Sequence, residues 1–148
     1  MYKILIGLFL SVLCLQAKCQ IQFDEGSFTE VLAKAKQEKR MVFMDCYTSW
    51  CGPCKMMAQE VFSREDVGQF MNTRFVNVKL DMEKGEGREL AKKYQVKVYP
   101  TFLILNEDGE VIHKIVGGMK AEEFLQHVQN GIGEHSLYSY EKRYAEGE

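Results

Sequence analysis

The stretch "TSWCGPCKMM", residues 48–57, brings Cys51 and Cys54 close together, with only Gly52 and Pro53 between them. A cysteine pair at this spacing serves as half of a metal site, as a structural disulfide, or as a dithiol that cycles with a disulfide. The remainder of the chain decides among these three.

The bulk composition is that of a globular protein with one domain. The chain has 148 residues, of which 46% are hydrophobic and 27% are charged, and this is enough for a single core. The net charge of −2 leaves no surplus of basic residues. We therefore expect no nucleic-acid partner, and we expect a monomer.

Residues 1–19 have the pattern of a secretory signal. Lys3 is followed by the apolar run "ILIGLFLSVLCL", residues 4–15, which is too short to span a bilayer comfortably. Residues 17–19, "AKC", form a candidate cleavage site because they have small residues at both ends. An uncleaved N-terminal membrane anchor is the alternative. The segment predicts export to a periplasmic or other extracytoplasmic compartment.

The mature chain would consist of a domain over residues 20–133 and a polar tail of unknown role over residues 134–148. It would retain Cys46, Cys51 and Cys54. Because an extracytoplasmic compartment is oxidising, a cysteine pair there is either locked as a disulfide or kept in exchange.

Helical and extended patterns alternate along the domain. Apolar residues at helical spacing predict helices over 27–39, 54–62, 63–71, 90–94 and 121–130. Extended patterns predict strands over 40–47, 75–81, 101–105 and 111–116. Capping boxes are expected at Ser27 with Glu30 and at Ser63 with Asp66. This order predicts an α/β fold in which helices cover both faces of a mixed sheet.

Cys51 lies where the predicted strand 40–47 has ended and a helix begins. A helix N-terminus presents free N–H groups and a partial positive charge, and both favour a thiolate. Pro53 suits the first helical turn because it has no N–H to lose. Cys51 is therefore the predicted exposed nucleophile, and Cys54, covered by its own helix, is the predicted resolving thiol.

The two alternatives to redox exchange find little support in the sequence. A structural zinc ion needs four ligands, and the remaining candidates, Cys46, His113, His127 and His135, are not paired at ligand spacing. We therefore expect no metal, and we expect the histidines on exposed faces or in the tail. A structural disulfide across so short a loop would stabilise the fold little. A redox-active pair that needs no cofactor is favoured.

The motif "WCGPCK", residues 50–55, resembles the active-site sequence of the thioredoxin family. The resemblance extends over residues 28–131. Within it, "VYPT", residues 98–101, resembles the cis-proline loop of the family, and Gly117 matches the glycine after the final strand. The resemblance implies a thioredoxin fold, with a central mixed sheet flanked by helices.

Two further segments resemble exported members of the family. They are the helical stretch "CKMMAQEVFSREDV", residues 54–67, and the polar insertion "MEKGEGRE", residues 82–89. Among exported members, the chain is similar to the carboxy-terminal domain of the transmembrane thiol:disulfide interchange reductases.

The resemblance also implies roles for residues around the pair. Pro100 is expected to have a cis peptide bond and to face the cysteines. Asp45 is expected to be buried and to accept the proton of the Cys54 thiol. From its charge alone, Lys55 is expected to add positive potential near the site, which solvation weakens. The implied substrate-binding residues are Trp50, Tyr99, Pro100, Thr101 and Gly117.

Two positions depart from the common family pattern. Many members pair the buried aspartate with a lysine on the next strand, and alignment of the predicted strands puts Asn77 at that position, with Lys79 further along. Cys46 follows Asp45 on its strand and should therefore point to the opposite face. We predict that Cys46 is a small apolar core residue.

These features predict a thiol:disulfide oxidoreductase that acts on exported proteins. Gly52 and Pro53 resemble the reducing members of the family, which favours a protein-disulfide reductase supplied with electrons by a membrane reductase. Two alternatives remain: a disulfide oxidase or isomerase on the same fold, and a non-catalytic binding module or chaperone.

Overall fold

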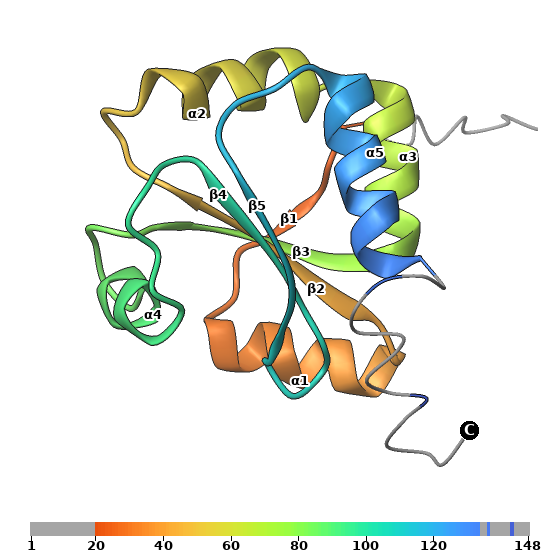
Figure 1. The fold of residues 1–148 in the computed structure, drawn as a ribbon. Coiled ribbons are helices and arrows are strands. Elements are labelled where there is room, and N and C mark those ends of the chain that lie inside the picture. Colours follow the sequence, from red (N-terminus) through yellow and green to blue (C-terminus); the bar gives the residue numbers. More distant parts are fainter. Residues whose placement is uncertain (1–19, 134–135, 137–142, 144–148) are drawn as a thin grey trace, which may run out of the picture.

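A five-stranded sheet forms the centre of the computed structural model, which describes residues 20–133 together with residues 136 and 143 (Figure 1). The strands are β1 (Phe23–Asp24), β2 (Met41–Tyr47), β3 (Phe75–Asp81), β4 (Thr101–Leu105) and β5 (Val111–Val116). The predicted signal segment and all but two residues of the predicted tail lie outside the described residues. Both assignments therefore stay predictions.

The sheet is mixed, as the sequence predicts. Its strands follow the order β1-β3-β2-β4-β5. The central strand β2 pairs in parallel with β3 and antiparallel with β4. β1 adds to β3 in parallel, and β5 adds to β4 antiparallel. The sequence does not predict β1, because two residues are too few to leave a periodic pattern.

Helices cover both faces of the sheet, which confirms the predicted layers. They are α1 (Phe28–Glu38), α2 (Gly52–Met56) with a π-helical continuation (Met57–Val61), α3 (Glu65–Arg74), α4 (Gly87–Lys93) and α5 (Ala121–Ile132). One core lies between the sheet and α1 and α4, and the other lies between the sheet and α2, α3 and α5. Within the described part of the chain, no helix combines the length and the apolar character needed to cross a membrane.

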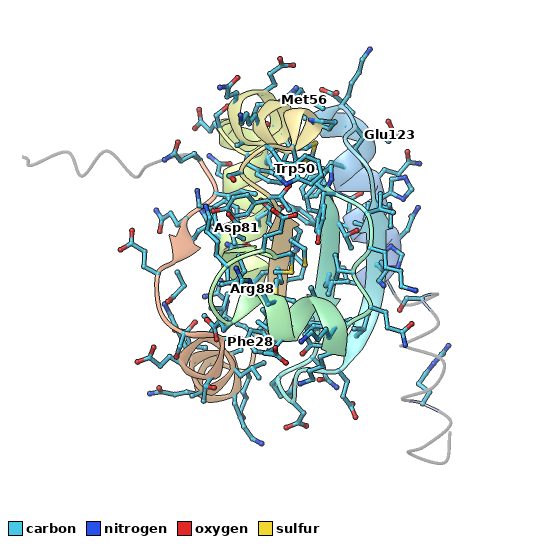
Figure 2. All side chains as sticks on the ribbon, turned by 90° about the vertical axis from the view of Figure 1, so that its left-hand side faces the viewer. Phe28, Trp50, Met56, Asp81, Arg88 and Glu123 are labelled. Atoms are coloured by element: carbon cyan, nitrogen blue, oxygen red, sulfur yellow. A yellow bond between two sulfur atoms is a disulfide. The ribbon has the colours of Figure 1, made fainter. Side chains whose placement is uncertain are left out.

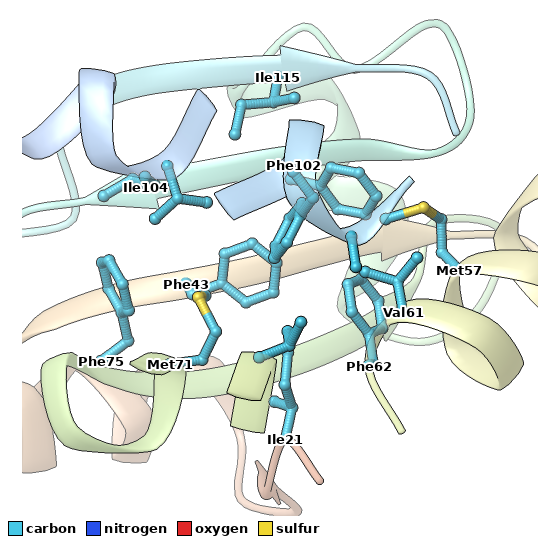
Figure 3. Close-up of a cluster of buried hydrophobic side chains, with 14 residues drawn as sticks. Ile21, Phe43, Met57, Val61, Phe62, Met71, Phe75, Phe102, Ile104 and Ile115 are labelled. Atoms are coloured by element: carbon cyan, nitrogen blue, oxygen red, sulfur yellow. The ribbon is translucent and has the colours of Figure 1, made fainter. Parts of the chain in front are cut away.

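Four phenylalanines hold the second of these cores. Phe43 from β2, Phe62, Phe102 from β4 and Phe124 from α5 are buried. Every pair of their rings has centroids between 5.5 and 6.1 Å apart, mostly edge to face (Figure 3). Such pairs add about 0.5–1.5 kcal/mol each beyond their buried area. Since Phe62 directly follows the helical segment that begins at the cysteine motif, the cluster fixes that segment to the sheet.

The two predicted capping boxes have different outcomes. The box of Ser27 and Glu30 is present at the start of α1. The box at Ser63 is wrong, because the N-cap of α3 is Arg64 and the Ser63 hydroxyl donates to the Gln59 carbonyl at 2.6 Å. Ser63 therefore ends one helical segment and does not begin the next.

Candidate active site

The cysteine pair lies beyond the carboxyl end of β2, at the first turn of α2. Cys51 and Cys54 form a disulfide, and their Cα atoms are 5.3 Å apart. Cys51 is the N-cap of α2, and its Sγ accepts a hydrogen bond from the Cys54 backbone N–H at 3.2 Å. Pro53 lies in the first turn, as predicted. The helix N-terminus therefore favours a thiolate at Cys51 once the disulfide is reduced.

Exposure does not distinguish the two cysteines. Cys51 is 3% exposed and Cys54 is 6% exposed, so the prediction of an exposed nucleophile is wrong for the disulfide form. Each sulfur covers part of the other in this form. The difference between the two lies in hydrogen bonding, because Cys51 Sγ accepts the backbone N–H of Cys54.

A cis peptide bond joins Tyr99 to Pro100 immediately before β4, as the resemblance implies. The Pro100 carbonyl accepts a hydrogen bond from the Gly117 N–H at 2.9 Å. Gly117 has a φ of +96°, a conformation that favours glycine. The buried Thr101 donates its hydroxyl to the Val98 carbonyl at 2.7 Å. These bonds hold the proline loop against the end of β5.

Gly118 brings the segment after β5 into contact with the cysteine motif. A Cβ atom at Gly118 would lie 2.9 Å from Met56 Cε and 3.2 Å from Pro53 Cβ. The contact joins segments that are far apart in the sequence, so no local pattern reveals it. The motif helix, the proline loop and the end of β5 therefore form one continuous site.

An exposed apolar rim surrounds this site. It consists of Trp50, Val98, Tyr99 and Val116. Trp50 is 64% exposed, Val98 55% and Val116 51%, while Tyr99 meets Trp50 edge to face, with ring centroids 6.1 Å apart. Large exposed apolar side chains gathered at one place mark a binding surface. The sequence does not identify Val98 and Val116 as substrate-binding residues, although each directly precedes a predicted binding residue.

Asp45 is buried on β2, as expected, with 5% exposure. Burial raises the pKa of its carboxyl group from 3.8 to about 7, against an opposing effect of the Lys79 ammonium. A carboxyl group with this pKa exchanges its proton readily near neutral pH. Asp45 is thus suited to exchange a proton with a neighbouring thiol.

The predicted partner position of Asp45 is wrong. The parallel register of β2 and β3 puts Lys79 opposite Asp45 and Asn77 opposite Phe43. A shift of two residues along a strand keeps every side chain on the same face, so the alternating pattern fits both registers. Asp45 therefore has a lysine as its cross-strand neighbour, and this chain does not depart from the family pattern there.

A cavity of about 150 Å³ connects Asp45 to the cysteine pair. Its lining residues are Asp45, Tyr47, Thr48, Ser49, Cys54, Lys55, Ala58 and Lys79. Among the described residues, Asp45 Oδ1 and Thr48 Oγ1 are buried without a hydrogen-bond partner. Polar groups that border a space of this size are positioned to share a water molecule. Thr48 is not predictable as a site residue from the sequence, because it belongs to no motif.

Two other residues were singled out in the sequence. Cys46 is fully buried in the core beneath α1 and α4, as predicted, and burial raises the pKa of its thiol. His113 is half-buried rather than exposed, and its Nε2 is buried without a hydrogen-bond partner among the described residues. The same part of the chain contains no group of three or more His, Cys, Asp or Glu side chains able to hold a metal ion.

A cysteine pair that caps a helix beside a cis-proline loop, on a sheet of this topology, defines a thiol–disulfide oxidoreductase. Residues 28–132 match the model of the thioredoxin-like domain. The chain belongs to the thioredoxin family.

Three known proteins illustrate the relationship. A solved structure from Bacteroides thetaiotaomicron, provisionally described as a disulphide-isomerase, is 47% identical, with a TM-score of 0.72 over 79% of this chain and 97% of that chain. Thioredoxin of Bacillus subtilis is 38% identical over 102 residues, which are 69% of this chain and 91% of the relative. Chloroplastic thioredoxin Y of Oryza sativa subsp. japonica is 30% identical over 107 residues, or 72% of this chain, and the match spans 58% of that protein's length.

Proposed function

We propose that this protein is an exported protein-disulfide reductase. The Cys51 thiolate attacks one sulfur of a substrate disulfide, forms a mixed disulfide and releases one substrate thiolate. Cys54 then transfers its proton to Asp45 and attacks Cys51 Sγ, which releases the second substrate thiolate. Two electrons pass to the substrate, and the Cys51–Cys54 disulfide remains on the protein. The two sulfurs carry both electrons, so the exchange uses no cofactor.

The observation that carries the reducing direction is the buried carboxyl group beside the pair. Reduced Cys51–Cys54 holds a negative thiolate, whereas the disulfide is neutral. An ionised Asp45 in a shared cavity disfavours the thiolate form. The exposed ammonium groups of Lys55 and Lys79 oppose this effect, but solvent and salt screen exposed charges more strongly than buried ones. The buried charge of Asp45 therefore contributes in favour of the disulfide, and this contribution makes the dithiol a better electron donor.

The apolar rim supports a polypeptide substrate. Trp50, Val98, Tyr99 and Val116 provide a surface beside Cys51 on which the residues flanking a substrate cysteine pack. Pro100, Thr101 and Gly117 fix the position of this surface through the bonds described above.

The reduction potential of the Cys51–Cys54 pair tests the direction. The oxidised protein is equilibrated with dithiothreitol or glutathione, and the fraction of free thiols is measured. We expect a value near that of thioredoxin, about −270 mV, and efficient reduction of insulin. A reduction potential of about −120 mV, together with oxidation of a dithiol peptide and no insulin reduction, would overturn the reducing direction.

A double variant, Cys51→Ser with Cys54→Ser, tests the catalytic assignment itself. It keeps the apolar rim and removes both redox sulfurs. We expect it to lose function in the cell. Full retention would identify the protein as a binding module or chaperone.

A second candidate function is disulfide isomerisation. The observation in its favour is the 47% identity with the neighbour provisionally described as a disulphide-isomerase. The assay that separates an isomerase from a reductase is the reactivation of scrambled ribonuclease by catalytic amounts of the reduced protein without an electron donor. Reactivation under these conditions identifies an isomerase. A reductase consumes one protein dithiol for each substrate disulfide, whereas an isomerase regains its dithiol at each turnover.

The proposed function also includes export of the protein and a membrane electron donor. The segment 1–19 supports export by its signal-like sequence, and outside the cytoplasm a reductase needs electrons from a membrane donor. N-terminal sequencing of the protein from fractionated cells is the test. A chain that begins near residue 20 in an extracytoplasmic fraction supports export, and an intact chain beginning at Met1 in the membrane fraction supports an anchor. A full-length cytoplasmic protein would overturn both.

A further inference from the structure

Trp50 is held in place by a carboxylate from a distant segment of the chain. Its Nε1–H donates to Oε2 of Glu83 at 2.9 Å. Glu83 lies between β3 and α4, within the polar insertion. Because Trp50 is 64% exposed, burial alone does not fix its indole. The hydrogen bond on one side and the ring of Tyr99 on the other set its orientation.

The backbone of Glu83 is itself fixed. Its N–H donates to Asp81 Oδ1 at 3.0 Å, and its carbonyl accepts a hydrogen bond from Arg88 Nε at 2.6 Å. Figure 2 shows Trp50, Asp81 and Arg88 along the side of the molecule that faces the viewer. The Glu83 side chain therefore extends from a turn that is already ordered. Little conformational entropy is lost when its carboxylate contacts a substrate.

No described lysine, arginine or histidine forms a salt bridge with Glu83, and the Lys84 ammonium acts on its charge only at longer range. Lys84 pairs with the Asp81 carboxylate at 3.0 Å, and Arg88 binds the Glu83 backbone through Nε. Residues 20–133 provide no salt bridge to Glu83. Glu83 is exposed, and the indole N–H uses only one of its two carboxylate oxygens. A fixed anion with a free acceptor oxygen therefore stands beside the apolar rim.

We propose that Glu83 is a specificity-determining residue that favours substrates with lysine or arginine next to the reactive disulfide. This inference rests on the proposed exchange with polypeptide disulfides. A substrate cation beside Trp50 meets the free oxygen of Glu83 and the face of the indole ring, which attracts cations as well. An exposed ion pair of this kind changes binding by about two- to five-fold, and the effect weakens as salt is added.

The test compares three peptides that contain the same intramolecular disulfide and differ only in the flanking residues, which are lysine, glutamine or glutamate. Since Trp50 is the single tryptophan of the chain, its fluorescence reports the exchange. For the reduced wild-type protein at low salt, we expect the lysine peptide to react about two- to five-fold faster than the glutamate peptide. This preference should shrink at high salt.

Three variants separate charge from position. Glu83→Gln keeps an acceptor for the indole N–H but removes the charge, so the preference for the lysine peptide over the glutamate peptide should vanish. Glu83→Ala also removes the acceptor, and the fluorescence anisotropy of Trp50 should then fall. Glu107→Gln removes the same charge from the turn between β4 and β5 and should keep the preference.

The outcomes are distinct. Equal nonzero rates for the lysine and glutamate peptides in the wild type would overturn this inference and leave the proposed function intact. A preference for the lysine peptide that persists in Glu83→Gln would also overturn this inference and leave the proposed function intact. An absence of exchange with all three peptides would overturn the proposed function and this inference together.

Discussion

Replacing Asp45 with asparagine should stabilise the folded protein at alkaline pH and change it much less at acidic pH. Burial raises the pKa of the Asp45 carboxyl group from 3.8 to about 7. Between these values the folded state keeps a proton that the unfolded state releases, so the free energy of unfolding falls as the pH rises through this window. An asparagine at this position carries no such charge to bury.

The magnitude follows from the gap between the two pKa values. The gap is about three pH units, and each unit corresponds to about 1.36 kcal/mol. The Asp45→Asn variant should therefore exceed the wild type in the free energy of unfolding by about 1 kcal/mol near pH 4.5 and by about 4 kcal/mol near pH 8.5.

Urea unfolding of the oxidised protein, followed by the fluorescence of Trp50, measures this difference at a series of pH values. Asp108→Asn is the matched control, because Asp108 forms an exposed pair with Lys36 and such pairs contribute about 0–1 kcal/mol. If wild type and Asp45→Asn give parallel curves of stability against pH, the assignment of a raised pKa to Asp45 is wrong.

Three further predictions concern Lys79, Gly131 and His113. Lys79→Met removes the charge that lowers the pKa of Asp45, so in urea unfolding the loss of stability with rising pH should continue to a higher pH than in the wild type, and an unchanged profile would show that solvent screens Lys79. Gly131→Ala places a Cβ against Cδ2 of the His113 ring, and this overpacking should lower the free energy of unfolding by about 1–3 kcal/mol; a neutral result would contradict the tight contact. Burial and the nearby His127 lower the pKa of His113 from 6.5, so the contribution of His113 to stability decreases as the pH falls below about 6.5, opposite in sign to that of Asp45. Relative to the wild type, His113→Gln should therefore gain in melting temperature between about pH 7 and 5, and a difference that does not change with pH would contradict the lowered pKa.

Most of the layered fold is predictable from the sequence because apolar periodicity is a local property. The strands predicted at 75–81, 101–105 and 111–116 agree with β3, β4 and β5. β1 is too short to leave a pattern, and the Ser63 capping box fails because α3 takes Arg64 as its N-cap while the Ser63 hydroxyl bonds back to the Gln59 carbonyl. The register of β2 and β3 is also beyond the sequence, since alternation alone fits both Asn77 and Lys79 opposite Asp45.

The residues of the candidate site also differ in whether the sequence alone identifies them. Cys51, Cys54 and Pro100 stand in compact local motifs, so the sequence identifies them. Gly118 and Glu83 act through contacts with segments far away along the chain, and nothing in their own neighbourhood signals those contacts. Their parts in the site depend on tertiary structure.

The alternation of side chains along β2 has a consequence for electron flow. Asp45 faces the cavity beside the redox pair, while Cys46, the next residue, lies in the opposite core. The backbone of a single strand therefore insulates a third thiol from the exchange reaction. In the proposed exchange, Cys54 and not Cys46 is therefore the described cysteine that is placed to release a mixed disulfide at Cys51.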